Sequence, residues 1–220
     1  MAVSYNPKIV TNGLVFALDA ANVKSYPGSG TTWTDLTGNS FNATSINSPT
    51  FTNNYFSLNG SSQYFTVSGT PLTSVTTCTI MMWIYSAASQ SDYAGLLYNR
   101  SGSNISGFHF FGTTNRLTWT WNADSWTYLY DSGLTVPQNA WSMVALSVGA
   151  TSTTFWVNTS SNTQTFTTVS QSFNAINIGR DPFGTRLFNG RIATTKMYNR
   201  ALTAAEIQQN FNALRGRYGI

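Results

Sequence analysis

The sequence has few of the residues that usually carry charge or perform chemistry. Its 220 residues include one cysteine, one histidine and one glutamate, and charged residues make up 8% of the chain, against about 25% in a typical soluble domain. A single cysteine excludes a disulfide within the chain, and we expect Cys78 to be a small buried hydrophobic side chain. The low charge excludes a coiled coil. The scarcity of acids and bases predicts a protein that is not an enzyme.

Long apolar runs are also missing. The longest, residues 80–85, is too short to cross a bilayer, and the N-terminal residues contain no apolar signal core. We therefore expect no membrane partner and a protein that is made in the cytoplasm and remains soluble there.

Basic residues exceed acidic ones, and the formal net charge is +4. Seven of the eleven basic residues lie in the last fifth of the chain: Arg180, Arg186, Arg191, Lys196, Arg200, Arg215 and Arg217. They are spaced singly, whereas binding to phosphates needs clustered cations, so we expect no nucleic acid partner. An acidic partner surface and a solvated face both remain open explanations of this bias.

Short segments with alternating apolar and polar residues dominate the chain, and Gly, Asn and Ser turns separate them. Residues 55–58 and 64–67 flank Asn59-Gly60, a turn dipeptide that predicts a hairpin. Residues 77–85 are apolar on both faces, which indicates a strand buried in a sandwich. About a dozen such strands predict an all-β fold of two antiparallel sheets in a single domain spanning residues 1–220, with residues 1–12 as an N-terminal arm.

One short α-helix is expected near the C-terminus, over residues 203–215. Thr203 and Glu206 have the spacing of a capping box. Ile207, Phe211 and Leu214 then form one apolar stripe, and Gly216 is expected to end the helix. This assigns the only glutamate a structural role.

Four segments resemble laminin-G-like, concanavalin A-like lectin-glucanase jelly-roll domains. GLVFALDAAN at 13–22 is similar to the opening strand of these domains, and WTDLTGN at 33–39 is similar to their W-x-D-x-S/T-G-N segment. Residues 55–65 resemble the F-D-G-x-x-D-Y-V hairpin, and residues 188–207 the last strand and closing helix. The resemblance runs from about residue 13 to 215 and implies a jelly-roll sandwich of two curved sheets.

Domains with this opening and this ending resemble structural proteins of tailed bacteriophages. The resemblance implies a virion protein, such as a capsid decoration or another outer-surface subunit. Its expected partners are other virion proteins, a major capsid or tail protein, and further copies of itself in a dimer or trimer. The alternative is a carbohydrate-binding module or phage adhesin that recognises host-surface glycan.

Catalytic and metal-binding groups are sparse in the sequence. Glycosidases need a pair of carboxyl groups, and the closest acids are Asp124 and Asp131, seven residues apart. His109 stands alone and is expected in the core or on a sheet face. Some relatives bind calcium, but for Asp35 and Asn39 we expect a role in a turn. We therefore predict no cofactor, with calcium left open.

The richest aromatic segment is residues 117–130. Trp119 and Trp121 share one strand face, and Trp126 and Tyr128 share another on the next predicted strand, residues 126–130. Together they form a candidate platform for the apolar faces of sugars. The same residues also fit the core between the two sheets, or an interface with a partner protein.

Overall fold

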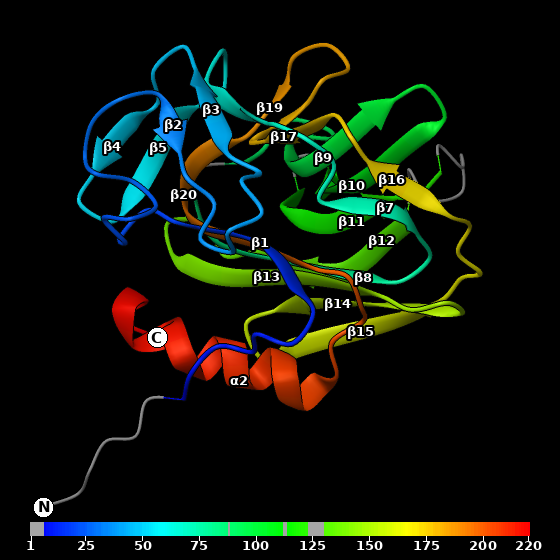
Figure 1. Ribbon diagram of the computed structural model, residues 1–220. Coiled ribbons are helices and arrows are strands. Elements are labelled where there is room, and N and C mark those ends of the chain that lie inside the picture. Colours follow the sequence, from blue (N-terminus) through cyan, green and yellow to red (C-terminus); the bar gives the residue numbers. More distant parts are fainter. Residues whose placement is uncertain (1–6, 88, 112–113, 123–129) are drawn as a thin grey trace, which may run out of the picture.

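In the computed structural model, which describes residues 7–87, 89–111, 114–122 and 130–220, two antiparallel sheets are stacked face to face (Figure 1). The first sheet has the strand order β15-β14-β13-β8-β20-β5-β4, and β1 also pairs with β20. The second has the order β12-β11-β10-β9-β17-β6-β3-β2. The architecture confirms the expected all-β sandwich.

The first sheet contains β1 (Leu14–Asp19), β4 (Thr50–Thr52), β5 (Tyr55–Asn59), β8 (Cys78–Ser86), β13 (Trp141–Val148), β14 (Ser152–Val157), β15 (Ser160–Thr165) and β20 (Asn189–Tyr198). The second contains β2 (Thr32–Trp33), β3 (Ala43–Ile46), β6 (Tyr64–Val67), β9 (Gly95–Ser101), β10 (Asn104–Phe111), β11 (Arg116–Thr120), β12 (Tyr130–Thr135) and β17 (Ile176–Ile178). Two small sheets pair β7 (Leu72–Val75) with β16 (Gln171–Phe173), and β18 (Arg180–Asp181) with β19 (Arg186–Leu187). The helices are α2 (Ala204–Leu214) and the 3-10 helix η2 (Arg215–Tyr218).

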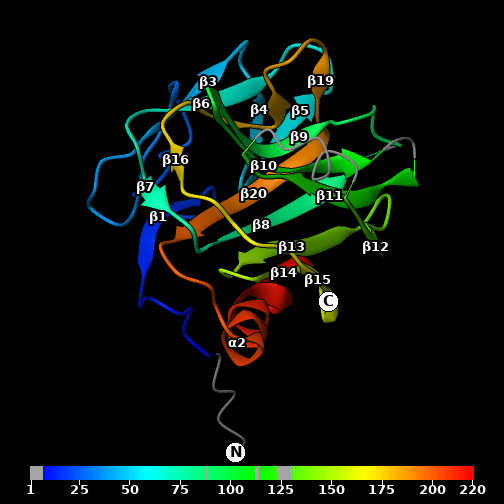
Figure 2. The same ribbon diagram turned by 90° about the vertical axis from the view of Figure 1, so that its right-hand side faces the viewer.

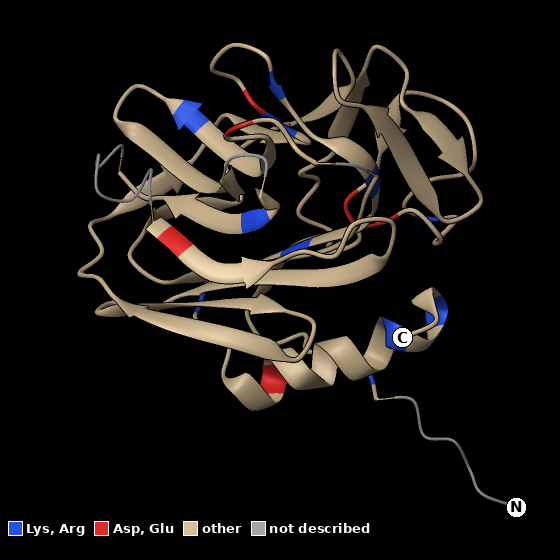
Figure 3. Ribbon diagram, turned by 180° about the vertical axis from the view of Figure 1, so that it is seen from behind, with Lys and Arg blue, Asp and Glu red and all other residues tan. Residues whose placement is uncertain are grey.

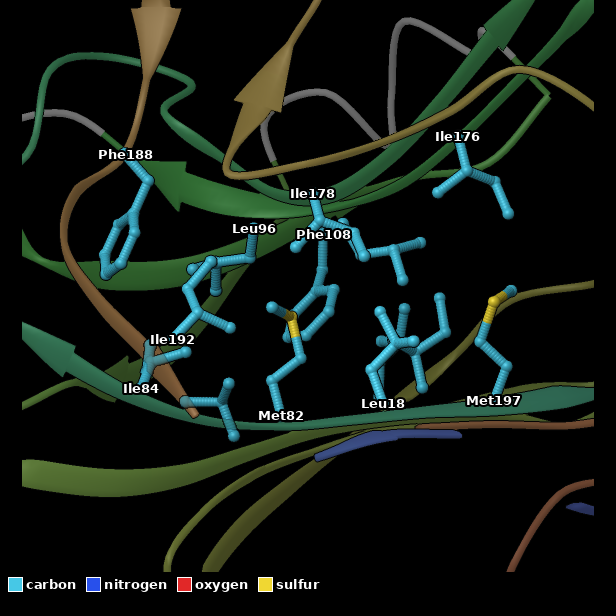
Figure 4. Close-up of a cluster of buried hydrophobic side chains, with 14 of the residues drawn as sticks. Leu18, Met82, Ile84, Leu96, Phe108, Ile176, Ile178, Phe188, Ile192 and Met197 are labelled. Atoms are coloured by element: carbon cyan, nitrogen blue, oxygen red, sulfur yellow. The ribbon is translucent and has the colours of Figure 1, made fainter. Parts of the chain in front are cut away.

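The main core fills the space between the two sheets. Side chains from the first sheet, such as Met82 and Ile192, point toward Phe108 and Ile178 from the second (Figure 4). Alternation along each strand places one set of residues in this core. Each large apolar side chain buried here contributes about 1.5–3 kcal/mol.

Strand β8 is buried on both faces, as its apolar sequence predicts. Ile80, Met82 and Ile84 enter the main core, whereas Met81 and Trp83 belong to a second cluster with Phe211 of α2 and Tyr218 of η2. The helix covers the outer face of the first sheet, away from the second sheet (Figures 1 and 2). The domain therefore has three layers at this point. Cys78, on the same strand, is fully buried as expected, and burial raises the pKa of its thiol to about 12.

The hairpin predicted for residues 55–58 and 64–67 is wrong. Both strands form, but β5 pairs with β4 and β20 in the first sheet, while β6 pairs with β3 and β17 in the second. Phe56 and Phe65 consequently face each other across the core, with ring centroids 4.9 Å apart. The Asn59-Gly60 turn carries the chain between sheets, with Gly60 at a φ of +68° and the Asn59 side-chain oxygen accepting from the Ser61 amide at 3.0 Å.

Other boundaries also differ from prediction. Of the strand expected at residues 126–130, only Tyr130 lies within the described residues, where it begins β12. The strands β2, β3, β4, β7, β16, β18 and β19 were not predicted. All seven are two to four residues long, which is too short for a periodic pattern to identify.

The predicted capping box is present at the start of α2. The Thr203 hydroxyl accepts a hydrogen bond from the Glu206 amide, and a Glu206 carboxylate oxygen accepts one from the Thr203 amide at 2.9 Å. Arg200 pairs with the same carboxylate. The α-helix ends at Leu214, which confirms the predicted span to within one residue. Gly216 does not stop the helical path, because η2 continues to Tyr218 and Gly219 takes the left-handed conformation at a φ of +74°.

The described part of the N-terminal arm lies against α2. The Val10 amide donates to the Asn210 side-chain oxygen at 2.8 Å, and the Tyr198 hydroxyl donates to the Val10 carbonyl at 3.0 Å. Charged residues are few (Figure 3). In the described ranges, no helix is long and apolar enough to span a membrane.

We expect the capping carboxylate to make stability depend on pH. The hydrogen bonds from Arg200 and from the Thr203 amide lower the pKa of Glu206 from 4.5 to about 2. This contribution is present above about pH 4.5 and is lost as the pH falls toward 2. Replacing Glu206→Gln should lower the free energy of unfolding by about 1 kcal/mol at pH 7. Urea unfolding at pH 7 and pH 2.5 checks this, since the difference between variant and wild type should be much smaller at the lower pH. A pH-independent difference would contradict it.

Candidate functional site

A short hairpin, β18–β19, lies at the top of the molecule in Figure 1. We call this hairpin, together with the loops beside it, the rim. Its sequence, Arg-Asp-Pro-Phe-Gly-Thr-Arg over residues 180–186, combines turn residues with an exposed aromatic side chain. Gly184 turns the chain at a φ of +73°, and Phe183 is 60% exposed. The tip therefore presents a large apolar side chain to solvent.

The Asp181 carboxylate fixes this hairpin to the second sheet. Its side chain is fully buried and accepts hydrogen bonds from Arg100 of β9 at 3.1 Å and from Arg186 of β19 at 2.7 Å. It also accepts from the Phe183 amide at 3.1 Å, which closes the turn. The backbone of β18 lies so close to Gly95 that a Cβ atom there would sit 2.2 Å from the Asp181 nitrogen. One carboxylate thus holds two arginines and the tip of the loop.

Two open hollows lie on either side of the tip. The first hollow, about 430 Å³ in volume, is lined by residues 91–93 of the β8–β9 loop and by residues 183–186. The second hollow, about 300 Å³, is lined by Asn47, Ser61, Ser62, Tyr64 and Arg180, together with residues 184, 185 and 187. Gly184 and Thr185 border both. Each hollow has the volume of a small-molecule site.

Tyr93 is held in an unusual backbone conformation beside the first hollow. Its φ is +60°, whereas every other described non-glycine residue with positive φ is Asn or Ser. The left-handed conformation costs an ordinary residue roughly 1–2 kcal/mol. The Arg186 guanidinium lies 4.4 Å from the centre of the Tyr93 ring and 4.7 Å from that of Phe183. Strained residues are concentrated at binding sites, where the surrounding structure pays for them.

The floor beneath Tyr93 is uncharged. His109, on the outer face of β10, is fully buried between Tyr93 and Tyr98, with ring centroids 5.4 and 5.5 Å away. Burial, and then the charges of Arg186 and Arg100, lower the pKa of His109 to about 3. The histidine is therefore neutral at physiological pH, and the expected position on a sheet face is confirmed. Within the described residues, neither ring nitrogen has a hydrogen-bond partner.

The aromatic platform predicted from the sequence is not found where the structure describes it. Trp119 and Trp121 are fully buried in the main core, where Trp119 meets Phe166 edge-on at 5.1 Å and the Trp121 indole donates to the Val169 carbonyl at 2.7 Å. The core position, one of the three interpretations left open, is the observed one, because pairing with Phe108 puts Trp119 on the inner face. Trp126 and Tyr128 lie outside the described residues.

The predicted turn role of Asp35 and Asn39 is confirmed. The Asp35 carboxylate accepts hydrogen bonds from the Ala17 amide at 2.9 Å and from the Thr37 hydroxyl at 2.7 Å, and Asn39 donates to the Val15 carbonyl. Of the two acids noted as neighbours, Asp131 pairs with Arg116, and Asp124 lies outside the described residues. In the part of the chain that the structure describes, no three His, Cys, Asp or Glu side chains gather to hold a metal ion.

The model of the concanavalin A-like lectin/glucanases superfamily (Laminin_G_3) matches residues 59–208 of the sequence, more than half of the chain. The chain belongs to this superfamily. The resemblance noted in the sequence is thereby confirmed for the domain. No curated protein sequence matches the chain.

Solved structures share the fold of this concanavalin A-like domain. A sialidase of Trypanosoma rangeli is 15% identical with a TM-score of 0.71, and the match covers 99% of this chain and 36% of the sialidase. Domain 4 of AbnA, an extracellular GH43 arabinanase from Geobacillus stearothermophilus solved with arabinotriose, is 19% identical with a TM-score of 0.67, covering 91% and 98%. The binding domain of Paraclostridial Mosquitocidal Protein 1 is 16% identical with a TM-score of 0.69, covering 91% and 52%. The chain thus spans about a third of the sialidase.

These likenesses correct one expectation. The sequence predicted a protein that is not an enzyme, but the concanavalin A-like domain shares its fold with chains of a sialidase and an arabinanase. The fold is therefore one of glycan-related proteins, enzymes among them. The count of acidic residues was a poor basis for the prediction, because glycoside hydrolysis needs only two carboxyl groups. The expected virion role finds no support in these matches and stays a prediction.

The sequence signal for the rim was present but was not used. Arg180 and Arg186 were considered only as singly spaced cations of the C-terminal fifth, and Asp181 was not considered. Asp181 lies between Arg180 and Arg186 in a segment with a Pro-Phe-Gly turn. This pattern indicates a loop whose conformation is fixed by an ion pair. The contribution of Arg100, eighty-one residues away, requires the pairing of β9 with its neighbours and is not visible in the sequence.

We expect Asp181→Asn to destabilise the domain by about 2–3 kcal/mol, because it leaves two arginines facing each other without their shared counter-charge. High salt should restore part of this loss by screening the repulsion. Asp131→Asn, which removes a more exposed ion pair with Arg116, is the control and should cost about 0.5–1 kcal/mol. Urea unfolding of both variants measures the difference. If both variants lost the same free energy of unfolding, the buried Asp181 would contribute no more to stability than the more exposed Asp131.

His109 should make the domain sensitive to mild acid. Its folded pKa of about 3 lies below the ordinary value of 6.5, so the unfolded chain gains a proton first and stability falls as the pH drops from 6.5 toward 3. The slope reaches at most about 1.4 kcal/mol per pH unit. His109→Phe keeps a ring and removes the titrating group, and it should flatten the fall between pH 7 and pH 5 in urea unfolding. An unchanged slope would contradict this.

Proposed function

We propose that this concanavalin A-like domain binds carbohydrate at the rim around the β18–β19 hairpin. The observation that carries the proposal is the first hollow, where Tyr93 and Phe183 flank the Arg186 guanidinium beside hydrogen-bonding side chains. Sugars present apolar C–H faces that stack on aromatic rings, and hydroxyl groups that bond to residues such as Ser91, Asp92 and Thr185.

The comparisons support the same class of ligand. The superfamily is named for lectins and glucanases, and the arabinanase domain that this chain covers almost completely was solved with arabinotriose. At 19% identity the likeness shows the fold alone, and the support for a ligand position on this chain comes from its own two hollows. The partial match to the sialidase adds a second glycan-related protein of the same fold.

The finer expectations from the sequence go beyond these observations. A place on the surface of a phage virion, assembly as a dimer or trimer, and contacts made by Trp126 and Tyr128 remain predictions. Of the functions expected from the sequence, the carbohydrate-binding alternative has the better support. An adhesin that recognises host glycan is compatible with it.

Phe183→Ser and Tyr93→Asn test the proposal on a glycan array followed by calorimetry with the best ligand. Each should weaken binding at least tenfold, or about 1.4 kcal/mol, because each removes one stacking ring. Asn tolerates the left-handed backbone at position 93, and Phe183 is exposed, so both variants should fold.

Val23→Ser is the matched control, because Val23 is an apolar side chain 76% exposed and is not part of either hollow. It should bind as tightly as the wild type. Unaltered binding by both rim variants, or the absence of any glycan binding by the wild type, would overturn the proposal.

A further inference from the structure

Arg180 lacks the counter-charge that the neighbouring arginines have. Arg100 and Arg186 both pair with Asp181, but no carboxylate in the described part of the chain lies within ion-pair distance of Arg180. Its guanidinium lies over the Tyr64 ring, 4.6 Å from the ring centre, and its buried Nε atom has no partner among the described residues. Because this cation without an acidic partner also lines the open second hollow, its guanidinium is suited to receive an anionic acceptor from outside.

The second hollow, which Arg180 lines, contains no acidic side chain to compete for the guanidinium. Its other polar lining residues are Asn47, Ser61, Ser62 and Thr185, all neutral. By contrast, Asp92 and Arg186 both line the first hollow. Around the whole rim, three arginines stand against Asp92 and Asp181, which leaves one net positive charge. That charge is concentrated on the side of Arg180.

The wall of the second hollow is fixed in advance of binding. The Asn47 side-chain Nδ2 donates to the Ser62 carbonyl at 2.9 Å, and the Gln63 side-chain Nε2 donates to the carbonyls of Asn47 and Ser48 at 3.1 and 3.0 Å. The Asn59 side chain accepts from the Ser61 and Ser62 amides, both at 3.0 Å. These hydrogen bonds hold the loops β3–β4 and β5–β6 together. The loops therefore lose little conformational entropy when a ligand binds.

We propose that the glycan bound at the rim carries an acidic group, a carboxylate or a sulfate, which seats in the second hollow against Arg180. A planar guanidinium forms shorter and stronger hydrogen bonds with such an anion than with a sugar hydroxyl. The neutral Asn, Ser and Thr side chains supply donors to the remaining oxygens. The neighbouring first hollow, which shares Gly184 and Thr185, takes the next part of the chain by ring stacking. This inference rests on the proposed function and narrows its ligand class.

The test uses pairs of probes that differ only in the acidic group. Galacturonate oligosaccharides are compared with their methyl esters, and sulfated lactose with lactose, by calorimetry on the full chain. The acidic member of at least one pair should bind at least tenfold tighter than its neutral counterpart, and 0.5 M salt should shrink the advantage. The pair that shows the preference distinguishes carboxylate from sulfate.

Arg180→Gln should abolish the preference, and Arg180→Lys, which keeps the charge without the planar fork, should retain part of it. Arg215→Gln is the matched control: it removes one positive charge at an exposed position in η2, which is part of neither hollow. It should bind as the wild type does. Ser61→Asp, on an exposed side chain of the hollow, should remove the preference by repulsion and serves if Arg180→Gln does not fold.

Equal affinity for the acidic and neutral members of both pairs would overturn the inference while leaving carbohydrate binding in place. An equal loss in Arg180→Gln and Arg215→Gln would also overturn it, because net charge and not the hollow would then explain the preference. If neither pair binds while the array detects neutral glycans, the acidic group is excluded and the rim remains a glycan site. If no glycan of any kind binds, both proposals fail.

Discussion

The burial of β8 on both faces is the constraint on which the rest of the fold depends. A strand whose side chains are apolar in both directions needs a cover on each side, since a single sheet partner leaves half of them in water. The second sheet covers Met82 and Ile84, and α2 with the N-terminal arm covers Met81 and Trp83. The closing helix α2 is therefore an integral part of the fold. It is the third layer that this one strand requires.

The sequence predicted the class of fold well, because alternation and capping are local signals. Residues 77–85 and the Thr203–Glu206 box contain in themselves the information that the structure uses. The β5–β6 turn shows where local reasoning ends. Asn59-Gly60 has the residues of a tight hairpin, yet the two strands belong to different sheets. What decides this is which partner pairs with each strand, and these partners lie elsewhere in the chain.

The candidate site was harder to predict for a related reason. Trp119 and Trp121 are sugar-binding residue types, but the register of β11 with β10 turns them inward. The residues that do line the hollows come from the β3–β4, β5–β6 and β8–β9 loops and the β18–β19 hairpin, which only the folded sheets bring together. The strain at Tyr93 has no sequence signature, because tyrosine does not by itself indicate a left-handed backbone. A rigid sandwich that displays variable loops is a common way to build a binding surface.

The pairing of β8 with β20 also has a consequence for how the protein is made. Strand β20 ends at Tyr198 and α2 at Leu214, whereas β8 begins at Cys78. On a ribosome, β8 emerges long before β20, which pairs with it, and α2, which covers one of its faces. The Val10–Asn210 contact joins residues 200 positions apart. The domain therefore cannot complete its fold until β20 and α2 have been synthesised, and contacts so distant in sequence make folding slow. Until then a nascent chain exposes one of its most apolar strands, which makes it a natural client for chaperones that act during synthesis.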